Sequence, residues 1–228
     1  MLLFICYTLL KKFGTKTTLF KYLKNQNFAK IFDYKLRISL CIILFPFFTE
    51  AQNSKLNYKI LRNGNNIGWL KLEKSTEGNT SNLLLTSEVK TKIIFPIKIS
   101  AKETSTFENG KLIHSLQLRK TNGTTKLNKE TKYINEAYEV SEGGEKQRLS
   151  IENIETNLLS LFFKEPSNLK SVYSDKLQRF IKIAKTDDGG YKISFEKGSS
   201  NCYYYKDGIC VKVKIEHSFY TAEIVMNY

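Results

Sequence analysis

Alternating apolar and polar positions are the main pattern of the chain after residue 51. Residues 97–102 place Ile, Ile and Ala on one parity and Lys, Ser and Lys on the other. Residues 191–196 and 209–216 repeat this split, with apolar positions set against lysines and glutamates. Because successive side chains of a strand point to opposite faces, each run has one dry and one solvated face. The pattern predicts antiparallel strands.

Pairs of turn-forming residues separate these runs. Asn-Gly, Asp-Gly and Gly-Gly pairs favour the tight turns of β-hairpins because their residues tolerate a positive φ. The predicted turns are at Asn63-Gly64, Glu77-Gly78, Phe95-Pro96, Asn109-Gly110, Asn122-Gly123, Gly143-Gly144, Gly189-Gly190 and Asp207-Gly208. Their spacing divides the chain into about ten to twelve strands.

A sheet of this size must curl, close or split to protect its edges. We therefore predict an all-β fold, an antiparallel up-and-down meander that forms an open or closed barrel with a lipocalin-like outline. A two-sheet sandwich is the alternative. One segment departs from the two-residue period: apolar residues recur at helical spacing between residues 151 and 162, and Pro166 follows them. This predicts a short amphipathic helix near residues 151–164 that plugs the mouth of the curved sheet.

The N-terminal part of the chain carries a targeting pattern. Lys35 and Arg37 precede an apolar run, residues 38–48, and small residues follow it. This order is typical of a secretory signal peptide, and the run is too short for a membrane span, which takes about 20 residues. We expect an exported protein, in the periplasm, associated with the outer membrane or secreted.

The predicted organisation has three parts. They are an N-terminal extension of unclear status over residues 1–33, a signal peptide over residues 34–51 that is cleaved after Ala51, and a single β-barrel-like domain over residues 52–228. The extension arises either from a gene start assigned too far upstream or from an unusually long basic region of the signal peptide. The sequence leaves both interpretations open.

The net charge of +14 arises from 36 Lys and Arg residues against 22 Asp and Glu residues. Residues 1–51 hold eight of the basic and two of the acidic residues, so the remaining chain carries +8. Beyond residue 51 the arginines are few and scattered: Arg62, Arg119, Arg148 and Arg179. Proteins that read nucleic acids cluster arginines for bidentate contacts. The charge therefore does not predict nucleic-acid binding.

Three stretches resemble a family of secreted Gram-negative envelope proteins that is classed as a domain of unknown function. They are residues 58–69 (YKILRNGNNIGW), residues 163–166 (FKEP) with residues 172–175 (VYSD), and residues 201–208 (NCYYYKDG). The resemblance covers nearly all of residues 56–228 and implies a curved antiparallel sheet. It implies no activity.

Five residues are candidates for ligand contacts: Trp69, Glu103, His114, Tyr204 and His217. Both histidines fall on the dry parity of their strands. There they can bind a metal, exchange protons, or lie at the edge of the core with hydrogen bonds to the backbone or to Tyr hydroxyl groups. Glu103 interrupts a dry series, either as a polar anchor in a cavity or as a strand end at a wet rim. No third ligand accompanies the histidines at metal-site spacing, so we predict no metal and no cofactor.

Cys202 and Cys210 flank a predicted hairpin turn. A two-residue loop places their sulfur atoms on opposite faces, and a three-residue loop places them diagonally, about 7 to 8 Å apart. Both arrangements exceed the usual reach of a disulfide. We predict two free thiols.

The sequence contains no nucleophile elbow, phosphate-binding loop, paired-carboxylate signature or zinc-ligand spacing. We therefore predict a binding protein and assign no catalytic residue. The first hypothesis is a periplasmic barrel that holds an apolar small molecule or lipid in a cavity of at least about 300 Å³.

The alternative is an envelope assembly or interaction protein with a filled barrel and a Lys-rich face that meets an anionic envelope surface. That face consists of Lys98, Lys102, Lys192, Lys212 and Lys214. A hydrolase that uses Glu103 or Glu165 is the least favoured interpretation. Ligand identity and oligomeric state are not predicted.

Overall fold

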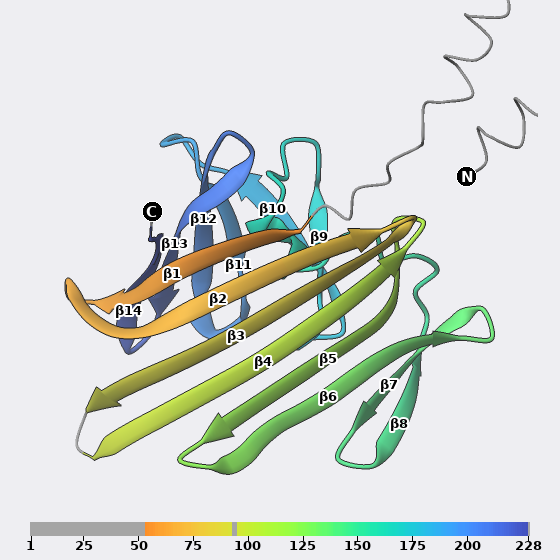
Figure 1. Ribbon diagram of the computed structural model, residues 1–228, viewed down its shortest axis with the longest axis horizontal. Coiled ribbons are helices and arrows are strands. Elements are labelled where there is room, and N and C mark those ends of the chain that lie inside the picture. The colour runs from red at the N-terminus through yellow and green to blue at the C-terminus, as the bar shows by residue number, and fades with distance from the viewer. Residues whose placement is uncertain (1–52, 93–94, 228) are drawn as a thin grey trace, which may run out of the picture. The chain divides into compact units, whose positions relative to one another are not determined.

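Fourteen antiparallel strands form one continuous sheet in the computed structural model, which describes residues 53–92 and 95–227 (Figure 1). All of them belong to the unit Thr49–Tyr228. The extension, signal peptide and cleavage site predicted for residues 1–51 lie outside the described residues. No helix in the described part has the length and apolar character that a membrane span requires.

The strands follow one another along the chain with two short 3₁₀ turns between them. They are β1 (Ser54–Arg62), β2 (Asn65–Glu77), β3 (Thr80–Lys92), β4 (Pro96–Glu108), β5 (Lys111–Thr121), β6 (Thr124–Ile134), β7 (Ala137–Glu142), β8 (Glu145–Leu149), η2 (Ser160–Phe162), β9 (Ser171–Ser174), β10 (Arg179–Lys185), β11 (Tyr191–Ser194), η3 (Glu196–Gly198), β12 (Ser200–Lys206), β13 (Ile209–His217) and β14 (Tyr220–Met226).

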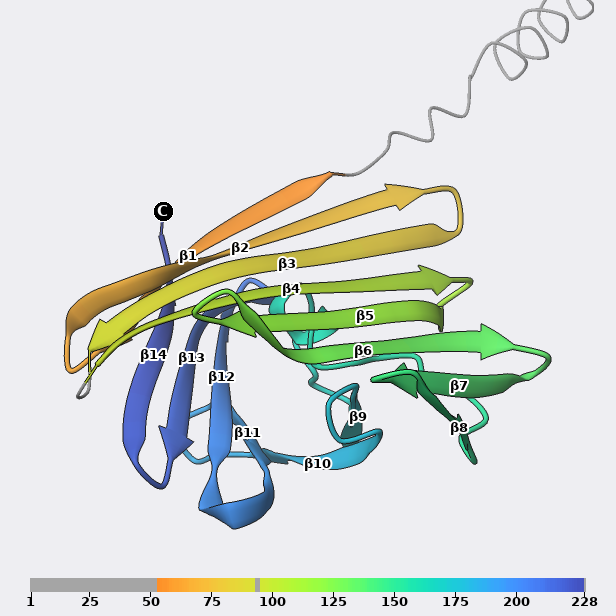
Figure 2. The ribbon, with the colours of Figure 1, turned by 90° about the horizontal axis from the view of Figure 1, so that it is seen from below.

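Strand order confirms the predicted meander in its open form. Each strand from β1 to β8 pairs with the next, as does each strand from β9 to β14, and β1 pairs with β14 to join the two series. The edges of the sheet are therefore β8 and β9, which are not paired with each other. The two series face one another, with the connection between β8 and β9 running through the space between them (Figure 2).

The residues of the hairpin turns explain why most strands were predicted correctly and why the sheet has more strands than the sequence predicted. Asn63-Gly64, Asn109-Gly110, Asn122-Gly123 and Asp207-Gly208 all have a positive φ at both residues, as their turn type demands. The turn between β6 and β7 uses Asn135 and Glu136, also at positive φ, and it contains no glycine. The β13–β14 turn, Ser218-Phe219, has no glycine either. Turn signals based on glycine could not find these turns, so the sequence predicted fewer strands.

The core lies on the inner face of the sheet, the face that the two series present to each other. The largest fully buried side chains include Tyr58, Leu72, Leu112, Tyr138 and Ile193. The opposite, outer face carries most of the lysines. Residues 97–102 and 191–196 keep the predicted dry and wet faces. In residues 209–216 the extra residue Val211 places Cys210 on the inner face instead of Ile209.

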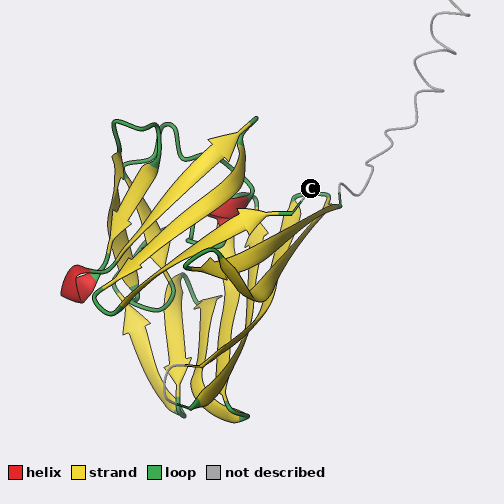
Figure 3. Cartoon of the chain, turned by 90° about the vertical axis from the view of Figure 1, so that its left-hand side faces the viewer, coloured by secondary structure: helices red, strands yellow, loops and turns green. Residues whose placement is uncertain are grey.

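Residues 150–170, here called the crossing segment, connect the edge strands and cover the inner face. Ile154, Leu161 and Phe162 are almost fully buried, and Phe162 packs edge-on against the rings of Tyr58 and Tyr203. Figure 3 shows the 3₁₀ turn η2 of this segment enclosed by strands. The apolar residues identified from the sequence therefore do plug the curved sheet.

The predicted helix over residues 151–164 is absent, and only η2 is helical there. The backbone of the segment is engaged elsewhere: Leu112 N donates to Ile154 O (2.8 Å), and Tyr173 N donates to Thr156 O (3.0 Å). Leu158 N in turn donates to Tyr173 O (3.1 Å). Because these groups bond to strands, they cannot make the bonds of an α-helix.

Tyr138 ties the crossing segment to the sheet and provides a test of this architecture. Its buried hydroxyl donates to Leu112 O (2.9 Å) and accepts from Ile154 N (3.1 Å). Tyr138→Phe leaves buried backbone groups with one partner fewer, so we expect a loss of about 1 to 3 kcal/mol in the free energy of unfolding. Denaturant titration measures it.

Tyr133→Phe is the matched control, because the Tyr133 ring packs against Tyr138 with centroids 5.0 Å apart. In the described structure its hydroxyl makes no such pair of backbone bonds. Equal stability of the Tyr138→Phe variant and the wild type would show that the crossing segment is not held through this hydroxyl.

Candidate functional site

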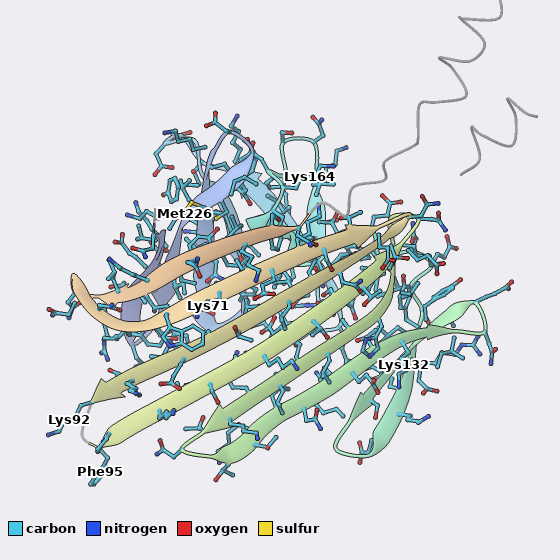
Figure 4. All side chains as sticks on the ribbon, in the orientation of Figure 1. Lys71, Lys92, Phe95, Lys132, Lys164 and Met226 are labelled. Carbon is cyan, nitrogen blue, oxygen red and sulfur yellow. The ribbon has the colours of Figure 1, made fainter. Side chains whose placement is uncertain are left out.

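A hollow of about 540 Å³ lies on the outer face where β1, β2 and β3 run side by side. The side chains that matter for its chemistry are Lys59, Asn66, Trp69, Lys71, Glu88 and Lys90. This volume falls within the range of small-ligand sites, about 300 to 1,000 Å³. Figure 4 shows Lys71 on this outer face.

The start of β2 is irregular, and this irregularity shapes the hollow. Ile60 pairs with Gly68 but Leu61 pairs with Asn66, so Ile67 is an extra residue in β2. Such a bulge bends a strand locally. The Asn66 side chain accepts a hydrogen bond from Gly68 N (3.0 Å), which fixes the bend.

Gly68 lets β2 and β3 approach closely beside the hollow. A Cβ atom at this position would lie 2.2 Å from Glu88 O and 2.9 Å from Val89 Cα. Any side chain would therefore force the two strands apart next to Trp69. The glycine is required by contact with the neighbouring backbone, and not by a positive φ.

Trp69 presents an exposed aromatic surface among lysines. Its side chain is 40% exposed, and it lies in cross-strand register between Lys59 of β1 and Glu88 of β3. Lys71 Nζ lies 5.2 Å from the ring centroid, within the range of a cation–π contact. The ring and the ammonium groups together form a mixed apolar and cationic surface.

Glu88 is the acidic group of the hollow, and lysines already bind it. Its carboxylate oxygens lie 3.1 Å from Lys90 Nζ and 3.0 Å from Lys98 Nζ. Hydrogen bonds from Lys98 and Lys90 hold the pKa of Glu88 below its ordinary value. Within the described residues, Lys59 and Lys71 have no ion-pair partner. The hollow therefore carries a positive excess.

A cluster of buried polar residues lies on the inner face, beneath the crossing segment. Ser115 Oγ donates a short hydrogen bond to Asp175 Oδ1, and Asn157 Nδ2 donates to Asp175 Oδ2 (3.0 Å). The same amide nitrogen lies 2.7 Å from Ser105 Oγ. We call these four residues the inner cluster. All four are at most 5% exposed, so the inner cluster is closed to solvent.

Burial controls the titration of the inner cluster. Loss of solvent raises the pKa of Asp175 from 3.8 to about 6, against the opposing effect of the Ser115 hydrogen bond. The nearby Glu103 carboxylate also raises it. The pKa of Glu103 is itself raised by burial, although Gln117 donates a hydrogen bond that lowers it. The inner cluster joins Asn157 of the crossing segment to β4 and β5, and its position indicates a structural role.

The structure does not bring the five predicted contact residues together. Trp69 lines the outer hollow, whereas Glu103 lies on the inner face near Asp175. His114 lies on the outer face, where its Nε2 is 2.9 Å from Glu130 Oε1. The reason is a bulge: Phe107 pairs with Leu112 but Thr106 pairs with His114, which reverses the parity within β5.

The other two candidates lie on the β9–β14 half of the sheet. Tyr204 points outward, donates to Asp188 Oδ2 (2.8 Å) and lies under Lys214 Nζ, 5.1 Å from its ring centroid. His217 is exposed at the end of β13 and stacks on Tyr220, with centroids 5.0 Å apart and planes at 10°. Neither residue is near the inner cluster or lines the hollow around Trp69.

Cys202 and Cys210 are free thiols, as predicted. Cys210 is buried on the inner face, and burial raises the pKa of its thiol to about 12. Cys202 pairs across the strands with Lys214 and lies beside Thr186. No group of three or more His, Cys, Asp or Glu side chains in the described ranges is arranged to hold a metal ion.

The sequence does not identify Gly68, Ser115 and Asn157 as site residues, and for Asp175 it leaves a site and ordinary capping of the predicted helix as alternatives. The Tyr-Ser-Asp stretch at residues 173–175 was a visible signal, but Asn157 and Ser115 become neighbours of Asp175 only through long-range pairing. Gly68 falls within residues 58–69, one of the stretches that carry the family resemblance. Its close contact with β3 depends on strand register, which a single sequence does not specify.

A family model matches residues 58–227, and its description is domain of unknown function (DUF6134). The chain belongs to this family. This confirms the expected membership of a family of unknown function, and the curved antiparallel sheet is the one that the resemblance implied. Searches of curated proteins and of solved structures found no match. Membership assigns no ligand, so function has to be argued from the geometry.

Asp175 predicts a specific pH dependence of stability. Its folded pKa of about 6 lies above the ordinary value of 3.8, so the folded state binds a proton more tightly than the unfolded state. Its contribution to the free energy of unfolding is largest below pH 4 and falls as the pH rises toward 6, by at most about 3 kcal/mol. Asp175→Asn removes this titration. We expect the variant to gain stability relative to the wild type across that interval.

Chemical denaturation at pH 4, 5, 6 and 7 tests the difference. Asp187→Asn, in the exposed turn between β10 and β11, is the control for a change of charge alone. Stability curves of wild type and Asp175→Asn that stay parallel over this range would rule out a raised pKa at Asp175.

Proposed function

We propose that the chain is an exported binding module of the cell envelope that recognises an anionic sugar through the hollow around Trp69. The observation that carries this proposal is an exposed indole ring in a hollow of about 540 Å³ whose lysines outnumber its acidic groups. We propose binding and not catalysis. The buried carboxylate with a perturbed pKa, Asp175, is enclosed beneath the crossing segment and so cannot meet a substrate.

The charge of the hollow favours an anionic ligand. Lys59 and Lys71 are free to bind a carboxylate or phosphate, whereas Glu88 is engaged by Lys90 and Lys98. A cationic ligand would have to displace one of these lysines. An anionic ligand needs no such displacement and gains two ammonium donors.

The shape and polarity of the hollow favour a sugar ring. A flat aromatic face exposed beside amide groups suits a ligand that has an apolar ring face and polar edges. Asn57 and Asn66 supply amide donors and acceptors at the rim. A long aliphatic chain would leave these groups without partners.

The filled inner face supports the second of the two hypotheses drawn from the sequence. Ile154, Leu161 and Phe162 of the crossing segment occupy the space that an apolar ligand would need. The predicted Lys-rich positions are on the outer face, where Lys98 bonds to Glu88 and Lys212 to Glu223. The outer face therefore offers the better-supported site.

Trp69 is the only tryptophan of the chain, so its fluorescence reports on the hollow directly. We expect titration with tetragalacturonic acid to change this fluorescence and maltotetraose, which is neutral, to leave it unchanged. Lys71→Gln and Lys59→Gln should each weaken binding about tenfold, the loss of one charge-assisted hydrogen bond. Added salt should weaken it as well.

Lys102→Gln is the matched control, since Lys102 is exposed on the same face, on β4, and does not line the hollow. Calorimetry with Trp69→Ala provides a second readout, and we expect no measurable heat of binding. Equal affinity for the charged and neutral oligosaccharides, or an unchanged affinity of the Lys71→Gln variant, would refute an anionic sugar site.

A further inference from the structure

We infer that the end of the sheet that carries the β1–β2 turn, the start of β4 and the β13–β14 turn docks onto the surface of an anionic lipid bilayer. The β1–β2 turn and the start of β4 lie at the left-hand end in Figure 1 and Figure 2; the β13–β14 turn lies lower in Figure 2, and Tyr220 beside it contacts Arg62 at the end of β1. The inference goes beyond the proposed sugar site because it uses different residues and needs no sugar. It rests on the aromatic side chains and the charges of this end.

Two phenylalanines project from this end. Phe219, in the β13–β14 turn, is 87% exposed, and Phe95, next to β4, is 75% exposed. They are the most exposed of the large hydrophobic side chains in the described part of the chain. Figure 4 shows Phe95 pointing away from the sheet at its lower left corner. Single exposed apolar residues are common, but two phenylalanines on turns at one end form a surface suited to the bilayer interface.

The surroundings of Phe219 are ordered by ring contacts. His217 stacks on Tyr220 and also contacts the Phe219 ring, with centroids 5.8 Å apart. The Arg62 guanidinium lies 6.0 Å from the Tyr220 centroid. Apolar rings with polar tips beside a guanidinium match the headgroup region of a bilayer.

The charges of this end select an anionic surface. Its glutamates already have partners: Glu88 binds Lys90 and Lys98, Glu216 lies 3.5 Å from Lys192 Nζ, and Glu223 lies 2.6 Å from Lys212 Nζ. Within the described residues Arg62 and Lys92 have no ion-pair partner. Both remain available for lipid phosphates.

The same charges argue against a second copy of the chain as the occupant. Self-association through this end would bring Arg62 and Lys92 of one copy toward those of the other, and like charges repel at short range. A bilayer that contains anionic lipid supplies the opposite charge together with an apolar layer for the two phenylalanines. It therefore satisfies both features at once.

Vesicle co-sedimentation of the chain isolated from cells that export it tests the inference. The probes are vesicles of phosphatidylcholine with 30% phosphatidylglycerol, and vesicles of phosphatidylcholine alone; neither lipid carries a sugar. We expect binding to the first and at least tenfold weaker binding to the second. The Phe95→Ser/Phe219→Ser variant should partition at least tenfold more weakly onto the anionic vesicles.

The Arg62→Gln/Lys92→Gln variant tests the charges separately, and each lost cation should weaken partitioning about fivefold. Ile134→Ser is the control, because Ile134 is 44% exposed at the opposite end of the sheet, in the β6–β7 hairpin. All variants share the N-terminus of the wild type, so any binding through that part is common to them.

Thermal melts establish that each variant is folded before the vesicles are added. Equal partitioning of the wild type and the Phe95→Ser/Phe219→Ser variant overturns the inference, as does equal binding to the two kinds of vesicle. A protein that binds these vesicles and ignores tetragalacturonic acid supports the docking end and refutes the sugar site. The reverse result refutes only the docking end.

Discussion

The structure depends on the burial of the inner face of an open sheet. Because β8 and β9 do not pair, the sheet never closes, and its apolar inner side chains need a cover. The crossing segment provides that cover with Ile154, Leu161 and Phe162. Two polar anchors fix the segment in place, the Tyr138 hydroxyl and the inner cluster around Asp175. Without this segment the inner face of the sheet would be exposed to water.

This constraint determines where function can reside. The crossing segment uses its backbone to bond to β5 and β9 and its side chains to fill the core, so the interior of the sheet is committed to stability. The side chains of the outer face do not fill this core, so they are not needed for its stability. Trp69 and its lysines lie on that face, and the exposed phenylalanines lie on turns at one end of the sheet. Such exposed apolar groups are a recognised mark of binding surfaces.

The sequence was sufficient to predict the architecture because the residues that form a hairpin turn are neighbours in the chain. An Asn-Gly pair specifies its turn, and a two-residue period specifies a strand, so the antiparallel meander followed from neighbouring residues alone. The helical spacing of Ile154, Leu161 and Phe162 correctly indicated burial and wrongly indicated a helix. Strands that are distant in sequence bond to the backbone of that segment, and no local pattern encodes those bonds.

The candidate site residues were harder to predict than the strands. One extra residue in a strand moves the side chains that follow it to the opposite face of the sheet. Ile113 in β5 and Val211 in β13 are such insertions, and the first moved His114 from the expected inner face to a pair with Glu130. Parity counted from the start of a strand fails after a bulge. Glu103 keeps its predicted face because β4 contains no extra residue at this shift.

Bulges also connect the fold to the proposed chemistry. The insertion at Ile67 and the missing side chain of Gly68 bend the start of β2 beside Trp69, and this bend forms part of the hollow. A regular β2 would pack Trp69 into a flat row between Lys59 and Glu88, with no concave surface for a ligand. A sequence pattern does not reveal this bulge, and yet the proposed site in this sheet depends on it.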